Sequence, residues 1–192
     1  MNKPTAFRKE KMKKGIYVLP NLFTTASLFC GFYSVIASVK GHYAVAASAI
    51  LIAIILDGLD GRIARMTNTM SKFGAEYDSL SDLVAFGVAP GVLMYTWSFF
   101  YYGKWGWLAA FLFVLCGALR LARFNVQINL IDSRVFNGLP IPAAAATAAT
   151  GVLLYFYLGG QGTYPSLVIM LAVVGIALLM VSSVILQFQG SE

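Results

Sequence analysis

Charged side chains are scarce in this 192-residue chain: Asp, Glu, Lys and Arg make up 11% of it, whereas hydrophobic residues make up 59%. This balance excludes an ordinary soluble domain and is typical of an integral membrane protein. Histidine and cysteine are scarcer still, with one histidine (His42) and two cysteines. Because Cys30 and Cys116 fall in different apolar stretches, we expect two small core residues rather than a disulfide or a metal pair.

Long apolar stretches dominate the rest of the chain. Each approaches or exceeds the ~20 residues that cross a bilayer, and together they predict an all-α membrane protein with six transmembrane helices. The stretches run approximately over 20–39, 43–66, 75–100, 106–124, 139–158 and 164–187. We therefore divide the chain into a basic juxtamembrane segment (1–19), a six-helix domain (20–187) and a tail (188–192) that departs abruptly from the last span, as an appended sequence would.

Basic residues are distributed unevenly around these stretches. With six spans, both termini share one side with the second-to-third and fourth-to-fifth connections, and only Lys40 and Lys104 lie on the other side. The positive-inside rule then places both termini in the cytoplasm, in a multi-pass protein of the cell (inner) membrane. The six cations of residues 1–14 serve this topology or also attract anionic membrane lipids. His42 lies on the outer side, which excludes histidine catalysis at the cytoplasmic side.

Acidic residues are few but concentrated, since five of the eight fall between positions 57 and 82. Four of these are Asp57, Asp60, Asp78 and Asp82. A carboxylate at membrane depth costs roughly 2.5–3.5 kcal/mol on insertion scales, and four close together also repel one another. We expect a cation to neutralise them, and that cation to be part of the function.

Helical spacing predicts how the four aspartates are arranged. Asp57 and Asp60 share one helix face, and Asp78 and Asp82 share another. The connection 66–73 is short, so the two helices form an antiparallel hairpin in which Asp57 faces Asp82 and Asp60 faces Asp78. Carboxylates at two matched depths suit hard divalent cations, Mg²⁺ or Mn²⁺ and two ions by charge, in a polar active-site cavity that faces the cytoplasm.

Two other interpretations of the aspartates are open. The first pairs them with arginines as buried ion pairs, but this explains neither the matched depths nor the small residues beside them. The second is a divalent-cation transporter, in which polar residues would continue along the ion path. The spans beyond Asp57 and Asp82 are apolar instead.

The spacing of these residues resembles a known family signature, D-x2-D-G-x2-A-R-x8-G-x3-D-x3-D, that of the CDP-alcohol phosphotransferases. All eight fixed positions are filled, by Asp57, Asp60, Gly61, Ala64, Arg65, Gly74, Asp78 and Asp82. The resemblance implies that a homodimeric enzyme transfers a phosphate-bearing group from a CDP-linked donor to an alcohol and releases CMP. It also implies that all four aspartates bind the metal and that Asp82 serves as general base.

The resemblance extends to residues that would bind the donor nucleotide and its pyrophosphate. Some belong to the signature, and others to the first helix and the hairpin connection. These donor-binding candidates are Pro20, Asn21, Thr24, Gly61, Ala64, Arg65, Ser71 and Gly74.

Two later segments, 119–125 and 136–143, resemble those of the phosphatidylserine synthases in this family. That resemblance implies CDP-diacylglycerol and L-serine as substrates. Because no histidine or cysteine nucleophile is available at the site, we predict direct transfer without a covalent enzyme intermediate. Arg120 and Arg123, with Asn125, are candidates to bind the acceptor, since a carboxylate needs a cation. The positive-inside rule alone explains the two arginines equally well, and glycerol 3-phosphate or an inositol phosphate is an alternative acceptor. No nucleic-acid partner is expected.

Overall fold

A computed structural model describes residues 5–67, 71–127 and 138–182, and all secondary structure in these ranges is helical. Side chains are described from Asn21 onward, with the exception of those of Ala64, Thr67 and Gln127. The helical segments are α1 (Thr5–Val39), α2 (Tyr43–Thr67), α3 (Lys72–Asp82), η1 (Leu83–Val88), α4 (Ala89–Met94), η2 (Tyr95–Phe99), η3 (Phe100–Tyr102), α5 (Lys104–Gln127), α6 (Ile141–Tyr157) and α7 (Leu167–Val181). The prediction of an all-α fold is confirmed for the described residues.

Four stretches are long and apolar enough to cross a membrane: Asn21–Val39, Tyr43–Ile63, Lys72–Tyr102 and Lys104–Val126. They coincide with the first four predicted spans. Two shorter apolar helices, α6 with 17 residues and α7 with 15, lie where the fifth and sixth spans were predicted. The chain is therefore a multi-pass membrane protein, with four stretches whose length and composition suit a membrane crossing.

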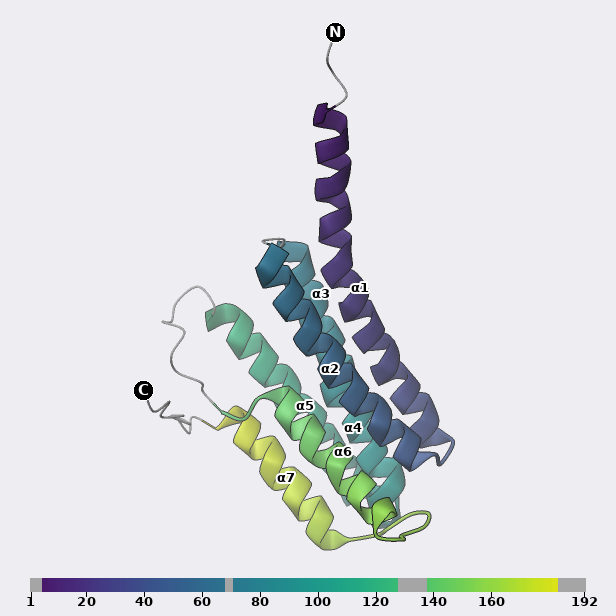
Figure 1. Cartoon of the computed structure of the whole chain (residues 1–192). Coiled ribbons are helices and arrows are strands. Elements are labelled where there is room, and N and C mark those ends of the chain that lie inside the picture. Colours follow the sequence, from purple (N-terminus) through teal and green to yellow (C-terminus); the bar gives the residue numbers. More distant parts are fainter. Residues whose placement is uncertain (1–4, 68–70, 128–137, 183–192) are drawn as a thin grey trace, which may run out of the picture.

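The third span comprises α3, η1, α4, η2 and η3, and consecutive spans and helices run in alternating directions through the bundle (Figure 1). The α1–α2 connection is tight because Gly41 adopts a positive φ of 78°, a conformation that residues with a Cβ rarely adopt. Figure 1 also shows that the first half of α1 extends beyond the rest of the bundle. Its second half packs along α2 and α3, so α1 lies beside both helices of the aspartate hairpin.

The third span changes its helical geometry directly after Asp82. A π-helical turn, η1, follows α3, and the Ala89 N–H donates to the Val84 carbonyl five residues earlier. Pro90 comes next and cannot donate a backbone hydrogen bond to the preceding turn, which favours a local departure from α-helical pairing. The span therefore departs from α-helical pairing directly beyond the last of the four aspartates.

α1 approaches the third span very closely at Gly31. A Cβ built on Gly31 would lie 2.6 Å from the Ala85 Cα, so only a residue without a side chain fits there. Gly31 and Ala85 are both buried. This contact holds α1 against η1 one turn beyond Asp82.

Gly31→Ala is expected to destabilise the fold by about 1–3 kcal/mol, because backbone must move to admit the methyl group. Thermal unfolding of the purified protein in detergent checks this as a lower Tm. Gly151→Ala is the matched control, since it adds a methyl group to a helix position with nothing within 4 Å. Equal Tm values for the two variants would show that the α1–η1 contact is loose.

Candidate active site

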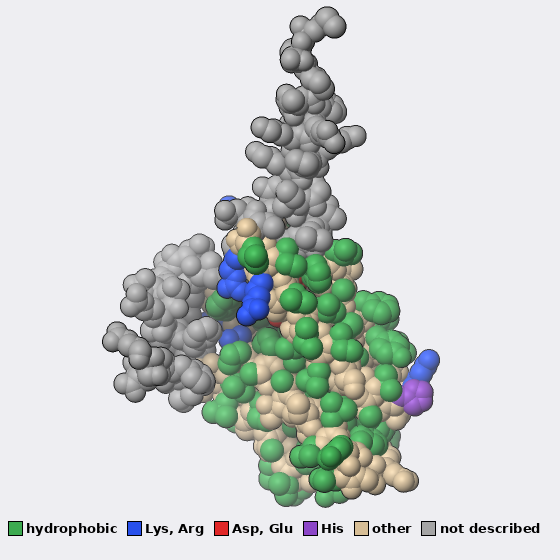
Figure 2. Space-filling model, viewed as in Figure 1, with side chains coloured by type: hydrophobic (Ala, Val, Ile, Leu, Met, Phe, Trp, Pro, Cys, Tyr) green, Lys and Arg blue, Asp and Glu red, His purple; other side chains and the backbone are tan. Residues whose placement is uncertain are grey.

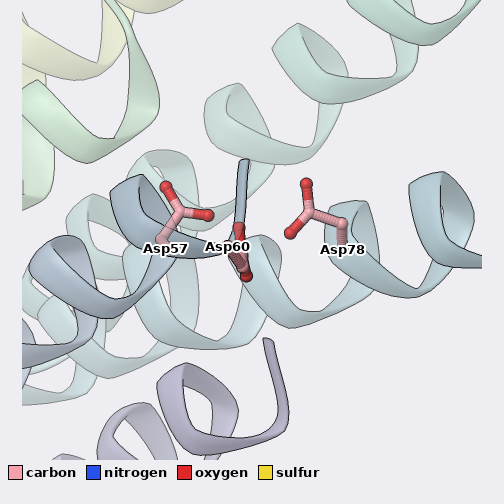
Figure 3. A group of neighbouring side chains, drawn as sticks. All are labelled: Asp57, Asp60 and Asp78. Carbon is pink, nitrogen blue, oxygen red and sulfur yellow. The ribbon is translucent and has the colours of Figure 1, made fainter. Parts of the chain in front are cut away.

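Three aspartate carboxylates converge at the α2–α3 hairpin. Asp57 and Asp60 project from α2 and Asp78 projects from α3, and Figure 3 shows the three side chains directed toward a common space. One oxygen of each lies within 4.8 Å of the others. Asp60 is only 5% exposed, whereas Asp57 and Asp78 are partly buried. The helical spacing therefore brings these carboxylates together as the sequence predicted.

Asp82 lies next to this group, one helical turn after Asp78 at the end of α3. Its carboxyl lies in side-chain hydrogen-bonding contact with that of Asp57. This contact agrees with the pairing of Asp57 and Asp82 expected from the hairpin. Two carboxylates approach so closely only when a proton or a cation lies between them.

The donor set fits a hard divalent cation. Among the described residues, the converging group consists of carboxylates alone, without histidine or cysteine, which suits Mg²⁺ or Mn²⁺ better than Zn²⁺. The Asp78 Oδ1 atom is buried and has no hydrogen-bond partner in the described part of the chain. A buried acceptor of this kind requires a ligand, and a metal ion would supply it.

The start of α3 is set by Ser71, one of the donor-binding candidates. Its hydroxyl caps the helix by accepting a hydrogen bond from the Gly74 N–H at 3.0 Å. A Cβ on Gly74 would lie 3.0 Å from the Ser71 hydroxyl oxygen and 3.5 Å from Asn21 Oδ1. Ser71, Gly74 and Asn21 therefore meet where α1 crosses the N-terminus of α3, one turn before Asp78.

The other donor-binding candidates lie along α1 and α2. The Thr24 hydroxyl donates to Asp60 Oδ2 at 2.9 Å, within the aspartate group itself. Arg65 is exposed, and its Nε donates to the Gly61 carbonyl at 2.9 Å. A Cβ built on Gly61 would have the Arg65 guanidinium as its nearest neighbour, at 3.9 Å, so the space beside Gly61 is open. The remaining candidates, Pro20 and Ala64, have side chains that lie outside the described residues.

The three acceptor candidates on α5 have different surroundings. Arg120 is partly buried, interacts electrostatically with Asp82, and has a buried Nε without a hydrogen-bond partner among the described residues. Arg123 is exposed and donates from Nη1 to the Val181 carbonyl at the end of α7, at 3.5 Å. The Asn125 amide donates to the Ser79 hydroxyl on α3 at 3.0 Å. Of the three, only Arg120 interacts electrostatically with an aspartate of the site, whereas Arg123 and Asn125 bond α5 to neighbouring helices.

Two serines between the aspartates were missed by reasoning from the sequence. Ser79 binds Asn125, and the buried Ser81 donates to the Thr24 carbonyl on α1 at 3.1 Å. Small hydroxyl residues within an apolar helix often bond to a neighbouring helix, and this signal could have identified them.

Residues 17–186 match the family model described as CDP-alcohol phosphatidyltransferase. This chain belongs to that family. This confirms the family predicted from the eight signature residues. Because the members of this family are transferases, the alternative of a divalent-cation transporter has no support. The CDP-alcohol phosphatidyltransferases are generally metal dependent, in agreement with the aspartate group.

Similar family members carry names that refer to serine transfer. The chain is 44% identical, over 88% of its length and 71% of the relative's, to the CDP-diacylglycerol–serine O-phosphatidyltransferase of Helicobacter pylori strain ATCC 700392 / 26695. It is 47% identical to the enzyme of the same name from H. pylori strain J99, over 76% of this chain and 63% of the relative. It is 37% identical to the archaetidylserine synthase of Methanothermobacter thermautotrophicus, over 91% of this chain and 72% of the relative.

Proposed function

We propose that this chain is a CDP-diacylglycerol–serine O-phosphatidyltransferase, which transfers the phosphatidyl group of CDP-diacylglycerol to the hydroxyl of L-serine and releases CMP. The observation that carries the proposal is the convergence of Asp57, Asp60 and Asp78, with Asp82 next to Asp57, in a chain of this family. The names of the three relatives support serine as the acceptor. Two are named CDP-diacylglycerol–serine O-phosphatidyltransferase, and the third, the archaetidylserine synthase, names a different lipid but also serine.

The proposed chemistry uses the aspartates in two ways. Asp57, Asp60, Asp78 and Asp82 would hold Mg²⁺ or Mn²⁺, in two ions by charge, and the bound metal would stabilise negative charge on the phosphoryl oxygens and on the departing CMP. Asp82 accepts the proton of the serine hydroxyl. The serine oxygen then forms a bond to the phosphorus that carries diacylglycerol, and the bond from that phosphorus to the CMP oxygen breaks.

Arg120 is the residue best placed to bind the serine carboxylate. Its guanidinium interacts electrostatically with Asp82, so an acceptor whose carboxylate it bound would lie on the side of the site that holds the proposed base. Arg123 and Asn125 would assist by holding α5 in place against α7 and α3. The donor nucleotide would be bound around Asn21, Ser71 and Gly74, with Pro20, Thr24, Gly61, Ala64 and Arg65 as further donor-binding candidates.

We also propose six crossings, including α6 and α7, with both termini and the active site on the cytoplasmic side of the inner membrane. On the face drawn in Figure 2, most of the visible Lys and Arg side chains gather in one cluster, and one more lies beside the histidine, away from that cluster. This distribution supports the orientation by the positive-inside rule. In this arrangement 1–19 is a basic cytoplasmic segment, 20–187 is the catalytic domain, 188–192 is a tail outside it, and two chains form a homodimer among membrane lipids.

Comparison of acceptors tests the proposed function. Purified protein is supplied with CDP-diacylglycerol and Mn²⁺ or Mg²⁺, and CMP release is measured with L-serine, glycerol 3-phosphate or an inositol phosphate. We expect kcat/KM for serine to be at least about tenfold the value for either phosphate, because a site built around one acceptor's polar groups rejects others. Faster reaction with a phosphate-bearing alcohol would assign another acceptor to the same chemistry.

A further inference from the structure

The buried hydroxyl of Thr24 binds one of the aspartates directly. Thr24 and Asp60 are each only 5% exposed, and the hydroxyl donates to Asp60 Oδ2 at 2.9 Å. A hydrogen bond to one carboxylate oxygen restricts rotation of the whole group. The second oxygen of Asp60 then has a defined direction relative to Asp57 and Asp78, with which Asp60 forms the converging group.

Two further buried hydrogen bonds hold this part of α1 in place. The Ser27 hydroxyl donates to the Ala53 carbonyl on α2 at 3.1 Å, and the Ser81 hydroxyl donates to the Thr24 carbonyl from α3 at 3.1 Å. Ser27 and Ser81 are each 2% exposed. α1 is therefore bonded to both helices of the aspartate hairpin within one turn of Thr24.

The close approach at Gly31 adds a third constraint on α1. Gly31 packs against Ala85 on the third span, two turns from Thr24 along α1. Sliding or rotation of α1 at Thr24 would therefore disturb a tight backbone contact as well as two buried hydrogen bonds. The position of the Thr24 hydroxyl is determined by the packing of three helices.

We propose that Thr24 is a positioning residue that orients Asp60 for metal binding, an inference that rests on the metal site of the proposed function. The residue had been assigned to the donor nucleotide by resemblance, but its hydroxyl is directed to the aspartate. Partners that orient a metal ligand typically change metal affinity by 10–100-fold when they are removed. Thr24 thus couples the position of α1 to the geometry of the carboxylates on α2 and α3.

The test measures metal affinity in the absence of substrate. Mn²⁺ binding to the purified protein is followed by electron paramagnetic resonance for Thr24→Val, which keeps the shape but removes the hydroxyl, and for Thr24→Ser, which restores it. We expect about tenfold weaker Mn²⁺ binding for Thr24→Val and recovery to within about threefold of the original affinity for Thr24→Ser.

Thr25→Val is the matched control, because the neighbouring hydroxyl bonds the Asn21 carbonyl and the Tyr77 hydroxyl instead of an aspartate. Its Mn²⁺ affinity should stay within about twofold of the original protein, since no metal-binding carboxylate loses a partner. An equal loss of Mn²⁺ affinity in Thr24→Val and Thr25→Val would show that both substitutions act by disturbing the packing of α1. That result would overturn the inference.

Binding of CMP to the same variants separates the remaining outcomes. Unchanged Mn²⁺ affinity in Thr24→Val with weaker CMP binding would make Thr24 a nucleotide contact and overturn the inference alone. A protein without substitutions that bound no Mn²⁺ would overturn the proposed metal site, and the inference with it. The two failures are therefore distinguishable.

Discussion

Replacing Asp82 by Asn is expected to lower kcat by about 10²–10⁴-fold, the range typical for removal of a general base. The amide keeps the size of the side chain but cannot accept the proton of the serine hydroxyl. Asp82 also interacts with Asp57 and, electrostatically, with Arg120, the residue proposed to bind the acceptor. Initial rates of CMP release at saturating CDP-diacylglycerol and serine measure the effect.

Glu76→Gln is the matched control for this substitution. Glu76 is an exposed acid on the same helix, and its amide variant should keep kcat within about twofold, as surface substitutions outside such a site usually do. Donor binding to Asp82→Asn should be largely preserved, because Asp57, Asp60 and Asp78 remain. Substantial turnover by Asp82→Asn would remove Asp82 as the base and leave it as a metal ligand only.

Chelation of divalent metal is expected to reduce CMP release by at least about 10³-fold, because the metal supplies most of the charge stabilisation at the phosphoryl group. The converging carboxylates of Asp57, Asp60 and Asp78 would then face one another without a cation, which also lowers stability. The measurement is the rate of CMP release after treatment with EDTA and removal of the chelator, followed by titration of Mg²⁺ or Mn²⁺.

Addition of EDTA already saturated with Mg²⁺ is the control for effects of the chelator on the detergent or the lipid substrate. It should leave the rate unchanged. Restoration by Mg²⁺ or Mn²⁺ but not by Zn²⁺ is expected from a site of carboxylates without thiolate or imidazole ligands. Full activity after chelation would show that the aspartates work without a metal ion.

The acceptor candidates illustrate where sequence spacing stops being informative. Arg120 and Arg123 lie about one turn apart, and this spacing by itself places them on neighbouring positions of one helix face. In the structure Arg120 interacts electrostatically with Asp82, whereas Arg123 donates to the Val181 carbonyl. Residues three apart differ by roughly 60° around a helix axis, so the packing of α5 against α7 and η1 determines which partner each side chain meets.

The sequence by itself determined the apolar spans, the hairpin and the convergence of Asp57, Asp60 and Asp78, as well as the family. These features depend on local helical periodicity and on a short connection, and both can be read from residue spacing. The tertiary structure alone decided that Thr24 binds Asp60, that Ser81 binds the Thr24 carbonyl, and that Asn125 binds Ser79. Such contacts join helices distant in sequence, and their partners depend on the rotation and depth at which the helices pack.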